Sequence, residues 1–357
     1  MSTLIVEVCE ISNVEKHPNA DLLDIYTIKG WKIISARKDE NGTPIPRYQI
    51  GDKIVFIPPD AILPIELSDR LNITKYLTPV KGIGGRVRAI RLRGIPSYGC
   101  MFEPDQDWPI GTDVKEFYGI TKWEPPIECT DGDAERTNHY FDRYTNIENI
   151  MNFPNVLQEG EEVIILEKAH GMNKRIAKCS SSEDGGKFIY MCGSHGVRRR
   201  EFDLNGNRSK FWFGLNDNTK KLLDHLCQDQ NNVIIFAELI GPGIQDMHYG
   251  RTSLDFVAYD ISINGQFMDS AEKFALFKEF DIPTSPILYQ GPFSMKKVEE
   301  LTSGPTLMCP PEKAGPFKGR EGIVITPTKE RINKTHRVIF KSISADYLAR
   351  KNGTDSH

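Results

Sequence analysis

The sequence predicts a small all-β barrel followed by an α+β domain. Runs that alternate apolar and polar residues fill the first 120 residues, among them LIVEVCEI, LLDIYTI and DKIVFIPP, and turn residues separate them. About five strands in roughly 100 residues are typical of a small closed barrel. After residue 142 strand-like runs such as NVIIFAELIG alternate with helical ones such as KKLLDHLC and SAEKFALFKEF, which indicates an α+β domain with its own core.

The boundary between the two domains is predicted from a loss of apolar periodicity. Residues 124–142, EPPIECTDGDAERTNHYFD, contain Pro, Gly and six acidic residues in place of alternating apolar ones. Such a composition is typical of a linker. We therefore expect a barrel over residues 1–122, a linker over 123–142 and the α+β domain over 143–357.

Composition excludes several classes of protein. The chain has 357 residues, 39% hydrophobic and 26% charged, as in ordinary soluble proteins. No apolar run approaches the length of a membrane span, and the amino terminus alternates like a strand, so we expect no export signal and no membrane partner. The seven cysteines lie apart without a CxxC pair, which argues against disulfides and structural zinc. These observations favour the cytosol or the nucleus.

Charge is unevenly distributed along the chain. The formal net charge is -4, yet residues 81–93 hold Lys81, Arg86, Arg88, Arg91 and Arg93 without an acid, and residues 198–200 are three arginines. A solvated basic surface explains any one such patch. Together they leave basic faces available for phosphate groups despite the acidic total.

A lysine at the end of an apolar strand is the first candidate for chemistry. The run VIIL, residues 163–166, indicates a buried strand, and Lys168 follows it directly before a glycine-containing polar turn. A buried strand end is a costly place for a cation. On its own this pattern is most often a surface lysine, so its meaning depends on the rest of the chain.

Six blocks follow in order: EKAHGMN, GSHGVRRR, FAELIGPGIQ, LDFVAYDI, EGIVITP and RVIFKSIS. Their order and spacing, over roughly residues 140–351, resemble the covalent nucleotidyltransferases, the superfamily of polynucleotide ligases and capping enzymes. The likeness is greatest to ATP-dependent RNA ligases of the nick-sealing RNA ligase 2 type, whose lysine motif often contains HG where DNA ligases have DG.

The resemblance implies a three-step reaction with ATP and Mg²⁺ or Mn²⁺. ATP adenylylates the lysine, AMP passes to an RNA 5′-phosphate, and a 3′-hydroxyl displaces AMP to join the ends. The expected substrate is RNA with 3′-OH and 5′-phosphate ends, preferably a nicked duplex, in RNA repair, and the expected enzyme is a monomer. Because only the free amine attacks phosphorus, we expect the pKa of Lys168 to lie below its usual value of about 10.4.

The resemblance also assigns roles to individual residues. Glu238 and Glu321 adjoin apolar strands, where an unpaired carboxylate would be costly, so they are either strand-end ion pairs or part of a site. The implied assignments are Lys168 as nucleophile, Glu167 and Asn173 at the nucleotide pocket, Glu238 at the ribose or metal, Glu321 at the metal, Tyr259 stacked on adenine and Lys341 at the α-phosphate.

One block leaves its assignment open, and another departs from the family's pattern. In GSHGVRRR the resemblance implies an arginine near the ribose and the donor phosphate; the block offers His195, Arg198 and Arg199, and we favour Arg198 because a guanidinium binds phosphate through two donors. In IFKSIS relatives often have a second lysine where this chain has Ile343, and Arg337 is a possible substitute. We expect His170 to shape its loop and not to transfer protons.

The amino-terminal domain has its own likeness. EKHPNADLLDIYTIKGW and RLRGIPSYG resemble the OB-fold tRNA-binding modules of some aminoacyl-tRNA synthetases, and an OB domain placed first resembles a smaller clade of RNA ligases. We hypothesise that Arg86, Arg88, Arg91 and Arg93 bind the RNA backbone. Alternation along one strand would place 86 and 88 on one face and 91 and 93 on the other.

Other functions remain open from the sequence. A GTP-dependent capping enzyme shares the lysine chemistry, and nucleotide preference separates it from a ligase. A non-catalytic RNA-binding protein with a degenerate ligase domain is a different class, which the presence of Lys168, Glu238, Glu321 and Lys341 disfavours. A DNA ligase is a further alternative. Sealing assays on nicks that differ only in the sugar at the 3′-hydroxyl end distinguish it from an RNA ligase, since the 2′-hydroxyl is the group that a protein must recognise.

Overall fold

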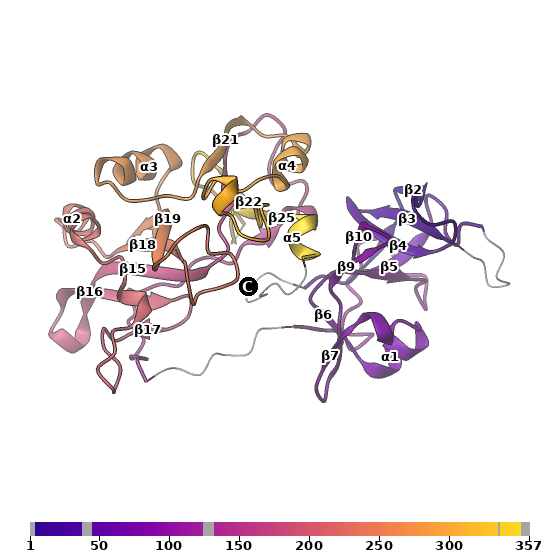
Figure 1. Cartoon of the computed structure of the whole chain (residues 1–357), viewed down its shortest axis with the longest axis horizontal. Coiled ribbons are helices and arrows are strands. Elements are labelled where there is room, and N and C mark those ends of the chain that lie inside the picture. Colours follow the sequence, from indigo (N-terminus) through magenta and orange to yellow (C-terminus); the bar gives the residue numbers. More distant parts are fainter. Residues whose placement is uncertain (1–3, 38–44, 124–131, 335, 351–357) are drawn as a thin grey trace.

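The computed structural model describes residues 4–37, 45–123, 132–334 and 336–350. Figure 1 shows two domains side by side, with the early strands at one end and the remaining elements at the other. The predicted order of an all-β domain and an α+β domain is confirmed. Among the described residues no helix has both the length and the apolar character needed to cross a membrane.

The amino-terminal domain is a strongly curved set of short sheets. Its sheets have the orders β1-β5-β11, β2-β3-β4, β10-β9 and β12-β6-β8-β7. Their inner faces hold two apolar clusters, one around Val55 and one around Tyr26. The strands and helices are β1 (Glu7–Glu10), β2 (Asn13–Lys16), β3 (Leu23–Ile28), β4 (Trp31–Ala36), β5 (Lys53–Ile57), β6 (Ala61–Leu63), α1 (Ile65–Arg70), η1 (Thr74–Tyr76), β7 (Thr78–Val80), β8 (Gly84–Arg86), β9 (Ala89–Leu92), β10 (Ile95–Tyr98), β11 (Cys100–Phe102) and β12 (Thr121–Lys122).

The HPNAD turn has a structural role in this domain. His17 is buried, and its Nε2 lies 3.1 Å from the carbonyl oxygen of Leu92. Asn19 donates from Nδ2 to the carbonyl of Arg93 over 3.1 Å. Arg93 and Gly94 have φ angles of 48° and 91°, so the β9–β10 turn is left-handed and needs this support. The turn thus fixes the end of the basic strand.

The second domain contains two sheets whose strands are antiparallel except for the pair β13 and β25. One has the order β17-β16-β15-β18-β19-β20, and the other has the order β13-β25-β22-β14-β21. The elements are β13 (Glu148–Asn149), η2 (Ile150–Asn152), β14 (Glu162–Lys168), β15 (Met172–Ser181), η3 (Ser182–Asp184), β16 (Lys187–Ser194), β17 (Arg198–Arg199), η4 (Lys210–Trp212), α2 (Asp217–Leu226), β18 (Val233–Ile240), β19 (Asp255–Ile263), β20 (Gln266–Phe267), α3 (Ser270–Glu279), β21 (Ile287–Pro292), α4 (Met295–Thr302), η5 (Pro311–Lys313), β22 (Gly322–Pro327), β23 (Ile332–Asn333), β24 (His336–Arg337), β25 (Phe340–Ile343) and α5 (Ala345–Leu348).

Burial explains why these segments are strands. The run at residues 163–166 is buried along its whole length, because β14 lies inside its sheet between β22 and β21. Helices α2 and α3 cover one face of the six-stranded sheet, and α4 packs against the five-stranded one. Between the two sheets, Phe236 and Ala177 from the first meet Val324 of the second and Ile339, which directly precedes β25.

Part of the expected linker packs against the second domain. Residues 124–131 lie outside the described residues. Further on, Asp133 pairs with Arg199 and Glu135 with Arg198, at 2.5 and 2.9 Å. Phe141 is buried, and the guanidinium of Arg175 lies 4.0 Å from its ring centroid. The segment just before residue 142 is therefore attached to the six-stranded sheet.

Candidate active site

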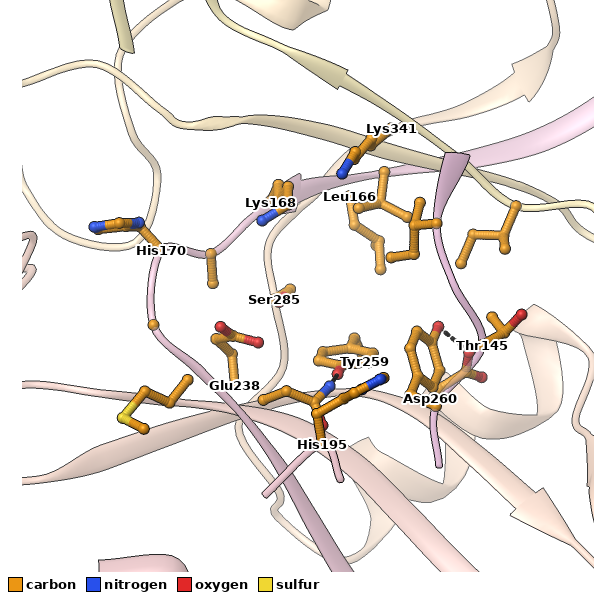
Figure 2. Close-up of a pocket in the computed structure, with 18 of the residues that line it drawn as sticks. Thr145, Leu166, Lys168, His170, His195, Glu238, Tyr259, Asp260, Ser285 and Lys341 are labelled. Atoms are coloured by element: carbon orange, nitrogen blue, oxygen red, sulfur yellow. Dashed lines mark hydrogen bonds between the residues drawn. The ribbon is translucent and has the colours of Figure 1, made fainter. Parts of the chain in front are cut away.

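A cavity of about 510 Å³ lies between the two sheets of the second domain. Figure 2 shows Lys168 and Lys341 on one side of it and Glu238, Tyr259 and His195 on the other. The predicted site residues that line this inter-sheet cavity are Glu167, Lys168, Asn173, Glu238, Tyr259, Glu321 and Lys341, with His170, His195 and Arg199. Residues far apart in sequence thus meet at one place.

Lys168 is positioned by the pairing of β14 with β22. Its partner in the register is Gly322, so the preceding residue, Glu321, lies beside it. The Lys168 Nζ donates to Glu321 Oε1 over 2.5 Å, and Glu321 is almost fully buried. A Cβ on Gly322 would lie 2.2 Å from the carbonyl oxygen of Ser342, so only glycine allows this close approach of β22 and β25.

The pKa of Lys168 differs from the expectation. Burial acts to lower it, but the negative charges of Glu321 and Glu238 and the hydrogen bond to Glu321 together raise the pKa above its usual value. The expectation that the pKa of Lys168 lies below its usual value is therefore wrong. Burial, together with the charge of Glu321, raises the pKa of Glu238 to about 8, although Lys168 opposes this rise.

Lys341 is the lysine with the lowered pKa in this cavity. It lies in β25 opposite Val324 of β22, on the same sheet as Lys168. Burial first, and then the positive charge of Lys168, lower the pKa of Lys341 to about 8. The pKa of Lys168 is raised and that of Lys341 is lowered, because only Lys168 is ion-paired with Glu321.

The opposite wall carries groups suited to a nucleoside. Asn173 in β15 stands opposite Glu238 in β18 and donates from Nδ2 to the Tyr259 hydroxyl over 2.6 Å. The other amide atom, Asn173 Oδ1, is buried and accepts no hydrogen bond from the described residues. Tyr144 supports the Tyr259 ring edge-on, with ring centroids 5.1 Å apart. A buried acceptor without a partner is costly, which indicates a place for a ligand donor.

Glu167 is used by the protein itself. Its carboxylate accepts from Thr306 Oγ1 over 2.5 Å and from the Leu307 backbone N–H over 2.7 Å. Strand alternation directs this side chain away from that of Lys168. Glu167 therefore borders the cavity while its charged group fastens the loop around residue 306.

The structure separates the two arginines of the second block. Arg198 pairs with Glu135 and Glu183, at 2.9 and 3.6 Å, and does not line the inter-sheet cavity. Arg199, its neighbour in β17, does line it. Adjacent strand residues point to opposite faces, so only one of the two arginines can reach the cavity. His195 also lines it, and burial lowers its pKa to about 4.

Arg337, the suggested substitute for a second lysine, lies outside the inter-sheet cavity. Its guanidinium is buried, 2.7 Å from Asp260, and forms a further ion pair with Glu330. It lies 3.7 Å from the Phe267 ring centroid and is not among the residues lining the cavity. Asp260 also accepts from Lys273 over 2.8 Å, and these two members of the charge cluster do line the cavity.

Residues 169–171, which we call the lysine loop, are held by contacts that motif reasoning missed. The His170 backbone N–H donates to the Tyr249 hydroxyl over 2.7 Å, and His170 Nε2 lies 2.7 Å from Asp246 Oδ1. A Cβ on Gly171 would lie 2.2 Å from the Leu239 carbonyl oxygen. Asp246 falls directly after the GPGIQ block, and this was the one sequence signal that pointed toward it.

The basic residues of the barrel are arranged differently from the prediction. Arg86 is buried and donates to Asp60 from Nε and Nη2, at 2.9 and 2.6 Å, with Trp123 stacked 3.4 Å from its guanidinium. Arg91 pairs with Asp346 of the second domain. Arg88 is half-buried and Arg93 exposed. Residues 86 and 91 belong to β8 and β9, which lie in separate sheets, so the alternation expected along one strand is wrong.

Sequence comparison identifies the class of protein. A model described as RNA ligase matches residues 161–343, just over half of the chain, and one described as an OB-fold domain matches residues 5–104. The chain therefore belongs to the RNA ligase family. No curated protein matches the sequence.

Solved structures show the same fold over nearly the whole chain. Naegleria gruberi RNA ligase with PPi is 22% identical with a TM-score of 0.73, covering 97% of this chain and 98% of that one. A variant with ATP and Mn gives 21% identity, the same coverage and a TM-score of 0.73. Another with AMP and Mn gives 22% identity and a TM-score of 0.72, over 96% of this chain and 98% of that one.

Proposed function

We propose that this chain is an ATP-dependent RNA ligase that seals 3′-hydroxyl and 5′-phosphate ends through a lysyl-AMP intermediate. The observation that carries the proposal is the position of Lys168 Nζ, 2.5 Å from Glu321 in a cavity that also holds Glu238, Tyr259 and Lys341. A nucleophile, two carboxylates, an aromatic ring and a second cation are the groups that nucleotidyl transfer requires.

In the first step the Lys168 amine attacks the α-phosphorus of ATP. A nitrogen–phosphorus bond forms, and the bond from that phosphorus to the pyrophosphate oxygen breaks. The amine must first lose a proton, since an ammonium has no lone pair. Lys341 lies on the same wall, where its charge would stabilise the negative α-phosphate as it passes through the transition state.

The two carboxylates fit a divalent cation. Mg²⁺ is usually bound by one or two carboxylates together with substrate phosphates. Glu238 and Glu321 both line the cavity, and the negative charges of both act on Lys168. A cation held by both would cancel the charges that raise the pKa of Lys168 and would stabilise the α-phosphate. The pKa of Glu238, about 8, means that this carboxyl releases a proton when it binds metal at neutral pH.

The wall formed by the six-stranded sheet would hold the nucleoside. Tyr259 offers a ring for the adenine, and Asn173 Oδ1 offers a buried acceptor for a hydroxyl or amino donor. We propose Arg199, in place of Arg198, as the phosphate ligand of the second block, because Arg199 lines the cavity. Its partner Asp133 keeps that guanidinium oriented.

The reaction proposed after adenylylation is nick sealing in RNA repair, by a monomer in the cytosol or nucleus. AMP would pass to the RNA 5′-phosphate, and the 3′-hydroxyl would then displace it. We propose residues 1–122 as an OB domain that helps to bind RNA, residues 123–142 as the connection and residues 143–357 as the adenylation domain. Of the four arginines, the exposed Arg93 remains a candidate for contacts with RNA phosphates, whereas Arg86 and Arg91 are ion-paired within the protein.

The decisive experiment uses α-labelled ATP and Mg²⁺ with protein freed of bound AMP. Label should remain on the denatured protein, and Lys168→Ala should abolish it. Lys178→Ala is the matched control, because Lys178 lies on β15, the next strand along the chain, and pairs with Asp224 at the surface. Absence of label with ATP, GTP and NAD from the folded protein would refute the proposal, and label with GTP alone would favour a capping enzyme.

The substrate is tested separately with nicked duplexes that differ only in the sugar at the 3′-hydroxyl. We expect faster sealing when that end is RNA, because the 2′-hydroxyl is the group that distinguishes it from DNA. Equal sealing of both nicks would remove the preference for RNA while leaving the lysyl-AMP chemistry intact.

A further inference from the structure

The short helix α5 lies between the barrel and the lysine loop. Figure 1 shows it at the end of the second domain that faces β9 of the first. Its Asp346 forms an ion pair with Arg91 of β9. The next residue, Tyr347, is fully buried in the second domain, where its hydroxyl contacts His170. One turn of helix therefore contacts both domains through adjacent side chains.

Tyr347 holds the imidazole of His170. A hydrogen bond of 2.9 Å joins its hydroxyl to His170 Nδ1, and the two rings pack edge-on with centroids 5.3 Å apart. The other ring nitrogen lies 2.7 Å from Asp246, which in turn pairs with Arg350 at 3.2 Å. Because both nitrogens are engaged, the orientation of the ring is fixed from two sides.

His170 in turn adjoins the carboxylate that pairs with Lys168. His170 Nδ1 lies 3.5 Å from Glu321 Oε2, and the other oxygen of Glu321 accepts from Lys168. Both His170 and Glu321 are buried to about 98–99%. In a packed interior of this kind a shift of the imidazole moves the carboxylate beside it.

The barrel end of this chain of contacts is also rigid. Arg91 donates from Nη1 to the carbonyl of Gly94 over 2.8 Å, which fixes its guanidinium on the β9–β10 turn. That turn is held by His17 and Asn19 of the HPNAD sequence. Arg91, whose guanidinium is held on this turn, therefore connects the barrel to α5 in a fixed position.

We propose that α5 couples the OB barrel to the nucleophile, with Tyr347 as a positioning residue that keeps His170 and Glu321 in register with Lys168. The inference rests on the proposed ligase function. Through the Arg91–Asp346 pair, a barrel docked on the second domain stabilises the arrangement in which Lys168 is adenylylated. A barrel that moves away releases α5 and slows this step.

The first test is Tyr347→Phe, which removes the hydroxyl and retains the ring. We expect the rate of lysyl-AMP formation at saturating ATP to fall about fivefold to tenfold, the usual effect of one buried hydrogen bond, with an unchanged KM for ATP. Tyr118→Phe is the matched control, since it loses a hydroxyl that accepts from the Asp105 backbone within the barrel. Both variants should melt at similar temperatures.

An unchanged rate for Tyr347→Phe would overturn the proposal, as would a rate loss accompanied by an equal rise in KM. If the parent protein forms no lysyl-AMP, the proposed function fails and this inference fails with it. If the parent forms it and Tyr347→Phe equals the parent, only the inference fails.

The second test exchanges the charges between the domains. Asp346→Arg and Arg91→Asp alone should each slow lysyl-AMP formation by up to about fivefold, the range for an exposed ion pair, and the double variant should recover most of the rate. Asp105→Arg is the control, because Asp105 pairs with Arg70 inside the barrel at 2.8 Å. Additive losses in the double variant would show that the pair does not carry the coupling.

Discussion

Glu238→Gln is expected to stabilise the protein while it removes activity. Glu238 lies beside Lys168 and Glu321 in the inter-sheet cavity, and burial and the charge of Glu321 raise its pKa from 4.5 to about 8. Burying a carboxylate beside another one is unfavourable, and the charge of Lys168 offsets this cost only in part. Glutamine has nearly the same shape and cannot ionise, so the variant avoids that cost.

The sign and size follow from the pKa. A carboxyl whose pKa is higher in the folded state contributes stability that is fully present below its unfolded pKa of 4.5 and is lost as pH rises through 8. The rise in the pKa from 4.5 to about 8 corresponds to about 5 kcal/mol when the loss is complete and to about 3 kcal/mol at pH 7. The advantage of the variant should therefore grow with pH.

The measurement is urea unfolding of parent and variant at pH 5, 7 and 9 in the presence of a chelator and without nucleotide. The difference in unfolding free energy should be small at pH 5 and reach several kcal/mol at pH 9. Glu162→Gln, at the exposed start of β14, is the control, since water solvates that carboxylate in both states. A difference for Glu238→Gln that does not change with pH would refute the reasoning.

Three further variants test other parts of the site. Glu321→Gln should lower the pKa of Lys168, so acetic anhydride should modify this lysine at a lower pH than in the parent, as detected by mass spectrometry. The same variant should slow lysyl-AMP formation. An unchanged pH profile of modification would contradict the reasoning. Tyr259→Ala should raise the KM for ATP roughly tenfold in steady-state kinetics whereas Tyr259→Phe keeps it, because the ring is proposed to stack on adenine, and equal KM values would exclude stacking. Gly171→Ala should lose about 2 kcal/mol or more in urea unfolding and most of the labelling, because its Cβ would meet the Leu239 carbonyl oxygen at 2.2 Å, and labelling at the parental level would show that the loop adapts.

Several residues that line the inter-sheet cavity could be predicted from the sequence, because each follows from the pattern of its immediate neighbours. Lys168, Glu238 and Glu321 each adjoin an apolar run, and a run of that kind predicts a buried strand: Lys168 ends β14, Glu238 lies within β18 and Glu321 directly precedes β22. The family resemblance of the ordered blocks then implies that these residues meet, and all three line the cavity.

Properties that depend on distant partners could not be predicted. Arg86 pairs with Asp60 from another loop, and no pattern in the basic stretch reveals that partner. Arg198 and Arg199 form a strand of two residues, too short for a period that would assign their faces. The pKa of Lys168 reflects a balance of burial against two carboxylates, and sequence supplies neither the distances nor the burial. Tyr347 reaches His170 across 177 positions of the chain.

The placement of the cavity between two sheets has a mechanical consequence. Lys168 belongs to the five-stranded sheet, whereas Tyr259 and Asn173 belong to the six-stranded one. An adenylate bonded to the lysine, with its base on the tyrosine, would act as an internal cross-link between the halves of the domain. A preparation in which only some molecules carry AMP would then be a mixture of cross-linked and uncross-linked molecules. These would unfold at different temperatures, and a single melting temperature would describe neither of them.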